Sequence, residues 1–220
     1  KENIDADKIF VTGNTVIDTL LDVQKRLPTY DTKQWAPMLP STLADTITSR
    51  RSRFILITGH RRENFGEGFE NFCSALKTIA AQNPEWILVY PVHLNPNVQG
   101  PVNAMLNEIS NIHLIAPQDY LPFVYLMSVS YIILTDSGGV QEEAPSLAKP
   151  VLVMRDTTER PEAVTAGTVK LVGADKTRII NNVSLLLDDQ AEYRKMSFAH
   201  NPYGDGKASQ RIVEGVATYA

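Results

Sequence analysis

The sequence has few residues that bind metal ions or form disulfides. Its single cysteine, Cys73, excludes an internal disulfide framework and is typical of a reducing cytoplasm. The four histidines lie on separate segments without the spacing of a metal site, so we expect neither a metal ion nor a cofactor. No apolar run approaches the roughly 20 residues of a membrane span, and no signal peptide is visible. We therefore expect a cytoplasmic protein.

Several signatures of well-known enzyme classes are also missing. The Walker lysine pattern is absent, and no Gly-x-Gly-x-x-Gly follows the first predicted strand, which argues against a conventional dinucleotide domain. No Gly-x-Ser-x-Gly elbow occurs, so a hydrolase triad has no support. The net charge of −4 argues against a general nucleic-acid binder, which needs a basic face.

Apolar runs rich in β-forming residues alternate with helical patterns along most of the chain. The predicted strands are residues 8–12, 54–58, 86–90, 113–116, 131–135, 151–154 and 169–172. Continuous apolar strands separated by helices predict βαβ units in a parallel sheet that is covered on both faces. We expect an α/β fold, with one doubly wound, Rossmann-like sheet of about six strands in a single domain, residues 1–220. Cys73 lies on the apolar stripe of the predicted helix 68–82, so we interpret it as a core thiol.

The stretch around Asp136-Ser137-Gly138-Gly139 is the first candidate site. It joins the apolar run 131–135 to a helical pattern whose first turn is predicted to contain Glu142 and Glu143. Glycines let a ligand approach the backbone closely, and unpaired N–H groups at a helix start favour an anion. The alternative is an ordinary helix start that carries two glutamates.

Polar residues also follow four other predicted strands, at the edge where ligands bind in parallel sheets. In chain order these candidates are His60 and Arg61, then His93, then Gln118 and Phe123, and then Arg160. Each group also has a purely structural interpretation. His60 and Arg61 would lie in an exposed charged loop, and His93 would make a local hydrogen bond. Gln118 and Phe123 would mark a helix start, and Arg160 would form a surface ion pair with its acidic neighbours. Their convergence on one edge of the sheet favours a site, and the residue types indicate a nucleotide or a phosphate as the ligand.

Taken together, these segments resemble the non-hydrolysing UDP-N-acetylglucosamine 2-epimerases. The resemblance rests on several motifs in order, which are Val11-Thr-Gly-Asn-Thr15, Thr58-Gly-His-Arg-Arg-Glu-Asn64, Tyr90-Pro-Val-His-Leu-Asn-Pro96, Leu134-Thr-Asp-Ser-Gly-Gly139 with Gln141-Glu-Glu143, and Arg155-Asp-Thr-Thr-Glu-Arg-Pro-Glu162. The resemblance implies the C-terminal half of a two-domain GT-B architecture, with the N-terminal domain and its catalytic carboxylates absent from this chain. It also implies that this chain alone is inactive.

The resemblance further implies an isomerase that interconverts UDP-GlcNAc and UDP-ManNAc by elimination and re-addition of UDP. Such enzymes serve polysaccharide biosynthesis and are homodimers that need no cofactor, nucleic acid or membrane. It assigns Ser137, Gly138 and Gly139 to the diphosphate and Glu143 to the ribose. It assigns Gln118 and Phe123 to the uracil side, Arg160 to the nucleotide as a cation, and His60 to both substrate binding and catalysis. It also places Arg61 and His93 in an allosteric pocket for a second UDP-GlcNAc.

Three other functions stay open from the sequence. A GT-B glycosyltransferase domain uses a similar Gly-rich helix start and acidic residue, although the motifs that contain His60 and Arg160 favour the epimerase. A hydrolysing 2-epimerase would release free ManNAc and UDP. A nucleotide-binding regulatory module would bind UDP and perform no chemistry.

Overall fold

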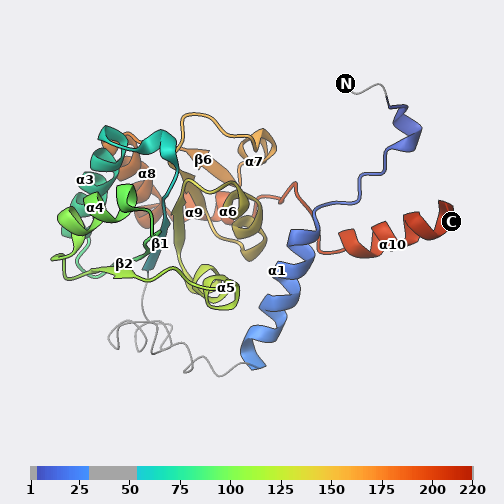
Figure 1. Cartoon of the computed structure of the whole chain (residues 1–220), viewed down its shortest axis with the longest axis horizontal. Helices are drawn as coiled ribbons and strands as arrows, with labels where there is room; N and C mark the ends of the chain where they lie inside the picture. The colour runs from blue at the N-terminus through green and yellow to red at the C-terminus, as the bar shows by residue number, and fades with distance from the viewer. Residues whose placement is uncertain (1–3, 30–53, 220) are drawn as a thin grey trace.

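The computed structural model describes residues 4–29 and 54–219, and its centre is a six-stranded parallel sheet (Figure 1). The strands are β1 (Phe54–Thr58), β2 (Ile87–Pro91), β3 (Ile112–Ile115), β4 (Ile132–Thr135), β5 (Val151–Val153) and β6 (Val169–Leu171). They lie in the order β3-β2-β1-β4-β5-β6, and every neighbouring pair is parallel. The predicted α/β class with one doubly wound sheet is confirmed.

Helices cover both faces of this sheet. One core cluster contains residues of α3 (Glu67–Gln82), α4 (Pro96–Leu106), α8 (Lys176–Asp188) and α9 (Gln190–Ser197). The other contains residues of α1 (Thr15–Arg26), α5 (Tyr120–Val129), α6 (Gly138–Glu143) and α7 (Pro161–Ala166). The first four residues of strand β1 are apolar because they face both layers: Ile55 and Ile57 belong to the first cluster, and Phe54 and Leu56 to the second. Successive side chains point to opposite faces of a strand, so a sheet covered twice needs apolar residues at every position.

The strand order creates a switch point between β1 and β4. The chain proceeds from β1 to β2 and β3 on one side, and then returns to place β4 on the other side of β1. Thr58 and Thr135 are register partners at the ends of these two strands, and their hydroxyl oxygens are 2.5 Å apart. Ligands in doubly wound sheets bind in the crevice that forms where the order reverses. The loops after β1 and β4 are therefore the first place to look for a site.

Two parts of the structure differ from the predicted elements. Residues 8–12 are not a strand: a 3-10 helix spans Ala6–Lys8, and Ile9, Phe10 and Val11 are exposed. A strand pairs its backbone groups with a neighbouring strand, and the sheet in the described part of the chain does not include this run. Helix α9 has no counterpart among the predicted elements. Cys73 is fully buried in α3 and burial raises the pKa of its thiol to about 12, which confirms the core interpretation.

The end of the described chain leaves the body of the sheet. Helix α10 (Ala208–Tyr219) and residues 4–14 extend away from the strands, and α10 begins beside α1 (Figure 1). The carboxylate of Asp18 in α1 accepts hydrogen bonds from the backbone N–H groups of Ala208 and Ser209, at 3.0 and 2.7 Å. This contact satisfies donors at the start of α10 and fixes it to α1. No helix within the described ranges is both long and apolar enough to cross a membrane.

Candidate functional site

A buried carboxylate joins the two loops at the switch point. Asp136 directly follows β4 and is fully buried. Its Oδ2 atom accepts hydrogen bonds from the backbone N–H groups of His60 and Arg61, both at 2.8 Å. Charge-assisted hydrogen bonds of this kind are stronger than neutral ones. The loop after β1 is thus held against the Ser-Gly-Gly segment after β4, as the predicted convergence requires.

Histidines and arginines from three loops gather around this junction. The imidazole ring of His93, from the loop after β2, stacks on that of His60, with ring centroids 5.2 Å apart and planes inclined by 15°. A side chain at Gly138 would lie 3.7 Å from a terminal nitrogen of Arg61 and from one of Arg160. Two guanidinium groups therefore flank the first residue of α6. Positive groups beside a glycine at a helix start suit an anion.

Helix α6 begins earlier than the sequence pattern indicates. Ser137 is its N-cap residue and makes no side-chain capping bond, and the helix runs from Gly138 to Glu143 before a 3-10 turn at Ala144–Leu147. Glu142 and Glu143 therefore lie in the last turn, and the prediction that they lie in the first is wrong. The first turn has no acidic residue, so no carboxylate within that turn accompanies its N–H groups. This removes the ordinary helix start with two glutamates as an explanation of the segment.

Glu143 is a buried carboxylate with an exposed tyrosine as its partner. Its exposed fraction is 9%, and the hydroxyl of Tyr120, the first residue of α5, donates a hydrogen bond to Oε1 at 3.1 Å. Burial raises the pKa of Glu143, the bond from Tyr120 lowers it, and the charge of Glu142 raises it. Gly139 is the nearest glycine: a side chain there would lie 3.9 Å from Oε2 of Glu143. The sequence did not single out Tyr120, although it lies between the candidates Gln118 and Phe123.

Arg160 forms an ion pair, but not with the neighbours that the sequence suggested. Its Nε atom donates to Glu142 Oε1, and this bond is the main reason that the pKa of the guanidinium is raised. Glu142 also accepts from Asn14 Nδ2 at 2.6 Å, which connects α6 to the start of α1. Glu159, next to Arg160 in sequence, is bound to Arg155 instead. The terminal nitrogen of Arg160 remains directed toward Gly138.

Arg155 is a structural residue that the sequence did not reveal. It is buried directly after β5, and it donates to Glu63 at 2.6 Å and to Glu159 at 2.6 and 2.9 Å. The bonds from Arg155 are the main reason that the pKa of Glu159 is lowered to about 2. Because Glu63 belongs to the loop after β1, the pairs connect the two loops that supply His60 and Arg160. An arginine immediately after a buried strand was the signal that could have identified it.

The remaining predicted residues, Gln118 and Phe123, lie beyond β3. The side-chain amide of Gln118 donates to the backbone carbonyl of Ala116 at 2.8 Å, and Phe123 packs against the second core cluster. Tyr120, which lies between them in sequence, bonds to Glu143, whereas Arg61 and Arg160 lie at Gly138 and His93 stacks on His60. The structure describes no group of three or more potential metal ligands in the ranges 4–29 and 54–219.

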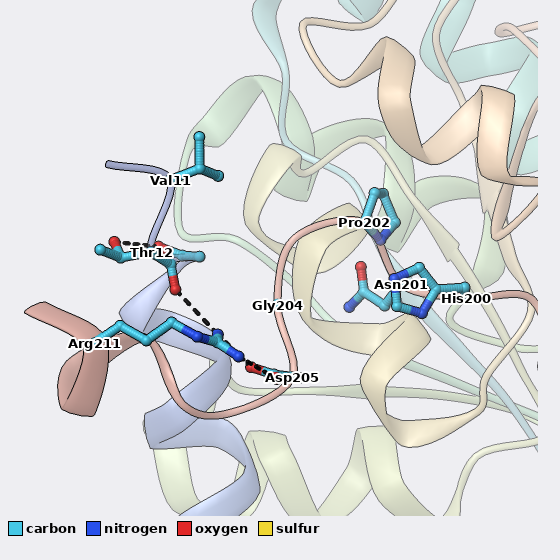
Figure 2. A pocket seen from close by; sticks show the side chains of 9 residues that line it. Val11, Thr12, His200, Asn201, Pro202, Gly204, Asp205 and Arg211 are labelled. Carbon is cyan, nitrogen blue, oxygen red and sulfur yellow. Dashed lines mark hydrogen bonds and ion pairs between the residues drawn. The ribbon is translucent and has the colours of Figure 1, made fainter. Parts of the chain in front are cut away.

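A cavity lies beside the residues that precede α1 and the loop that precedes α10. It has a volume of about 220 Å³, and residues 11–13, the loop around Asn201 and helix α10 line it (Figure 2). Its cation, Arg211, is bound by Asp205 through two hydrogen bonds of 2.8 and 2.6 Å and also donates to the Thr12 carbonyl. The charge of Arg211 is thus neutralised locally, and the cavity offers no free cation to a phosphate among its lining residues.

Comparison with known proteins identifies the fold and its family. The sequence pattern of the family described as UDP-N-acetylglucosamine 2-epimerase matches residues 1–217. The chain belongs to this family. The UDP-N-acetylglucosamine 2-epimerase of Salmonella typhimurium is 57% identical over 221 residues, which cover all of this chain and 57% of that protein. This member of the epimerase family therefore spans just over half the length of such a curated relative.

Solved structures of epimerases carry the same fold. The UDP-GlcNAc 2-epimerase of Neisseria meningitidis bound to UDP-GlcNAc superposes with a TM-score of 0.87 at 51% identity, over 99% of this chain and 57% of that one. The epimerase of Methanocaldococcus jannaschii, in complex with UDP-GlcNAc and UDP, gives 0.77 at 31% identity, over 100% and 57%. The expected match to one half of such an enzyme is confirmed. The roles of the individual site residues stay predictions.

Proposed function

We propose that this chain is the UDP-binding half of a UDP-GlcNAc 2-epimerase, residues 1–220 forming one domain. The observation that carries the proposal is the arrangement at Gly138. Two guanidinium groups flank a glycine that begins a helix whose first turn has no acidic residue. The whole lies at the switch point of the sheet, where a doubly wound fold binds nucleotides. Family membership supplies the identity of the nucleotide.

Each predicted contact has a physical basis in the described residues. The hydroxyl group of Ser137 and the backbone N–H groups of Gly138 and Gly139 would bind the diphosphate, with Arg160 and His60 beside it, since the Ser137 N–H is bonded to the Thr135 hydroxyl. The carboxylate of Glu143 would accept hydrogen bonds from the ribose hydroxyls, which are donors. Because Tyr120 occupies only Oε1, the other oxygen is available to the ribose.

The uracil side of the proposed site lies beyond Glu143. Gln118 has an amide that can pair with a planar base, and Phe123 has an aromatic face, although its ring is partly occupied by the core. In the ligand-free chain the Gln118 amide is bonded to its own loop. Binding of uracil would have to replace that bond, so this contact contributes less than the diphosphate contacts.

The proposed chemistry uses this site for the leaving group. UDP departs from C1 of the sugar with the electrons of the C1–O bond while a proton is lost from C2, giving 2-acetamidoglucal; re-addition of UDP with a proton on the other face of C2 completes the inversion. Charge that develops on UDP is stabilised by donors and cations that are already in place. The residues that move the C2 proton are proposed to lie outside this chain, and the intact enzyme is proposed to be a cytoplasmic homodimer.

A regulatory pocket remains the proposal for Arg61 and His93. Both touch the substrate cluster: His93 stacks on His60, and the Arg61 guanidinium lies at Gly138. A second nucleotide sugar bound by these two residues would therefore meet the first at His60. This contact gives a physical path by which one ligand could alter the affinity for the other.

The test combines binding and product analysis. Calorimetry should show that the chain binds UDP, with ADP as the control for the base, and binding of neither nucleotide would contradict the proposal. Incubation of this chain with UDP-GlcNAc should give no UDP-ManNAc. Formation of UDP-ManNAc would contradict the proposal that this chain is only half of the enzyme. The intact protein should give UDP-ManNAc without an acceptor, whereas free ManNAc with UDP would identify the hydrolysing branch.

A further inference from the structure

One oxygen of the Asp136 carboxylate is unexplained by the fold. The Oδ2 atom holds the backbone N–H groups of His60 and Arg61, as described above. The Oδ1 atom is buried, and it has no hydrogen-bond partner in the part of the chain that the structure describes. Burial of a charged oxygen without a donor is costly, so proteins rarely leave one in this state. We therefore expect this oxygen to accept a hydrogen bond from a group that approaches it.

The imidazole ring of His60 approaches Oδ1. Its Nδ1 atom lies 3.5 Å from Oδ1, just beyond a well-formed hydrogen bond. The ring is held on one face by His93, and its side chain remains 42% exposed. Hydrogen bonds of groups that act on a substrate shorten when the substrate binds. A small rotation of the His60 ring would close the gap to Asp136.

The surroundings of the ring come from four loops. Asp136, after β4, is the acidic group that faces it, and His93, after β2, is the titratable group stacked on it. Arg61 adjoins it in the loop after β1, and Arg160, after β5, reaches the same glycine as Arg61. Among these groups, Asp136 is the carboxylate in contact with the ring.

We propose that Asp136 is the positioning residue of His60, accepting a hydrogen bond from Nδ1–H and thereby directing Nε2 toward the leaving diphosphate. The inference rests on the proposed function for the identity of the ligand. When Nδ1–H is bound to a carboxylate, a positively charged ring still has Nε2–H to donate. A diphosphate needs a donor, and the carboxylate behind the ring orients the ring so that Nε2 faces the diphosphate.

A purely structural role makes a different prediction. If Asp136 only fixes the loop, the two backbone bonds to Oδ2 are all that matters. Asp136→Asn separates the two roles, because the amide oxygen can still accept both backbone N–H groups. The amide nitrogen would then face Nδ1 as a donor, so a neutral His60 ring would have to present a lone pair there and carry its proton on Nε2.

The experiment measures on which nitrogen the neutral ring carries its proton. The chain is labelled with ¹⁵N in its histidine rings, and long-range ¹H–¹⁵N correlation spectra are recorded without nucleotide at alkaline pH, where imidazole rings are neutral. His60→Gln identifies the His60 signal among the four histidines. Asp156→Asn is the matched control, because Asp156 is exposed in the loop after β5 and pairs only with Arg178 in the described chain.

We expect the Nδ1–H form of His60 in the unmodified chain and in the Asp156 variant, and the Nε2–H form in Asp136→Asn. The signals of His113 and His200 should stay in place and report that the fold is intact. An Nε2–H form in the unmodified chain overturns the proposal, and so does a folded Asp136→Asn that keeps Nδ1–H. If Asp136→Asn does not fold, the unmodified chain alone decides.

Addition of UDP then separates the two hypotheses. A shift of the His60 nitrogen signals on UDP addition links the pair to the nucleotide site. If UDP produces no shift in any signal while the Nδ1–H form is present, the proposed nucleotide is wrong and the role of Asp136 stands. If UDP binds but His60 carries its proton on Nε2, the nucleotide site stands and the role of Asp136 is wrong.

Discussion

Replacement of Gly138 by alanine tests the anion site most directly. Gly138 does not adopt a positive φ angle, so an L-residue meets no backbone strain there. An added Cβ atom would lie 3.7 Å from the nearest side-chain atoms, nitrogens of Arg160 and Arg61, which is ordinary van der Waals contact. The ligand-free chain therefore accommodates alanine without moving its neighbours. A phosphate oxygen approaching the N–H groups at this helix start would instead meet the new methyl group.

We expect Gly138→Ala to raise the stability of the fold and to weaken UDP binding. Removing the freedom of glycine from the unfolded chain should stabilise the fold by about 0.4–1 kcal/mol. For a domain of this size, this corresponds to a rise of about 1–4 °C in Tm. Losing one hydrogen bond from the backbone to a charged phosphate should cost about 1.5–3 kcal/mol of binding free energy. The Kd for UDP should therefore rise by roughly 10- to 150-fold.

The assay compares three proteins by calorimetry and thermal melting. Gly215→Ala in α10 is the matched control, since an added Cβ atom there meets nothing within 4 Å and the site is remote from β4. This control should bind UDP like the unmodified chain. If folded Gly138→Ala also binds UDP with unchanged affinity, the diphosphate does not approach this glycine. A clear loss of stability in Gly138→Ala would instead show that the packing argument is wrong.

Three further predictions concern carboxylates and the core. Glu143→Ala should weaken UDP binding, measured by calorimetry, by about 1–3 kcal/mol. Glu143→Gln should raise Tm at neutral pH, because the raised pKa of Glu143 means that its charged form costs stability in the folded chain. The difference in Tm should vanish in acid, where the carboxyl of the unmodified chain is protonated. The pKa of Glu159 is lowered to about 2, so its pair with Arg155 should stabilise the fold above about pH 4.5. That contribution should be lost as the pH falls through about 2. A ¹³C titration of the Glu159 carboxyl with an ordinary midpoint near 4.3 would contradict this prediction. Cys73, whose thiol has a pKa of about 12, should not react with a thiol reagent unless urea unfolds the chain, and rapid labelling of the native chain would refute its burial.

The sequence alone is sufficient to predict the class of fold and the edge of the sheet at which the candidate site lies. A strand covered on both faces must be apolar at every position, so runs such as 54–58 and 131–135 directly indicate parallel strands. Because ligands gather at the carboxyl ends of such strands, the positions of His60, Ser137 and Arg160 along the chain already predict that they share one edge. Motifs such as Thr58-Gly-His-Arg-Arg-Glu-Asn64 are specific enough to indicate the family.

The tertiary structure decided which side chains pair, because those contacts join residues far apart in the chain. Glu159 precedes Arg160 in sequence, yet Arg160 pairs with Glu142, which lies 18 residues earlier in α6. Asp136 holds the backbone of His60, 76 residues away, because β1 and β4 are neighbours in the sheet. The apolar run 8–12 has the propensity of a strand, but strand formation depends on a neighbour that sequence spacing does not reveal. Local pattern therefore indicated the six strands of the sheet, and only the tertiary structure determined which side chains pair.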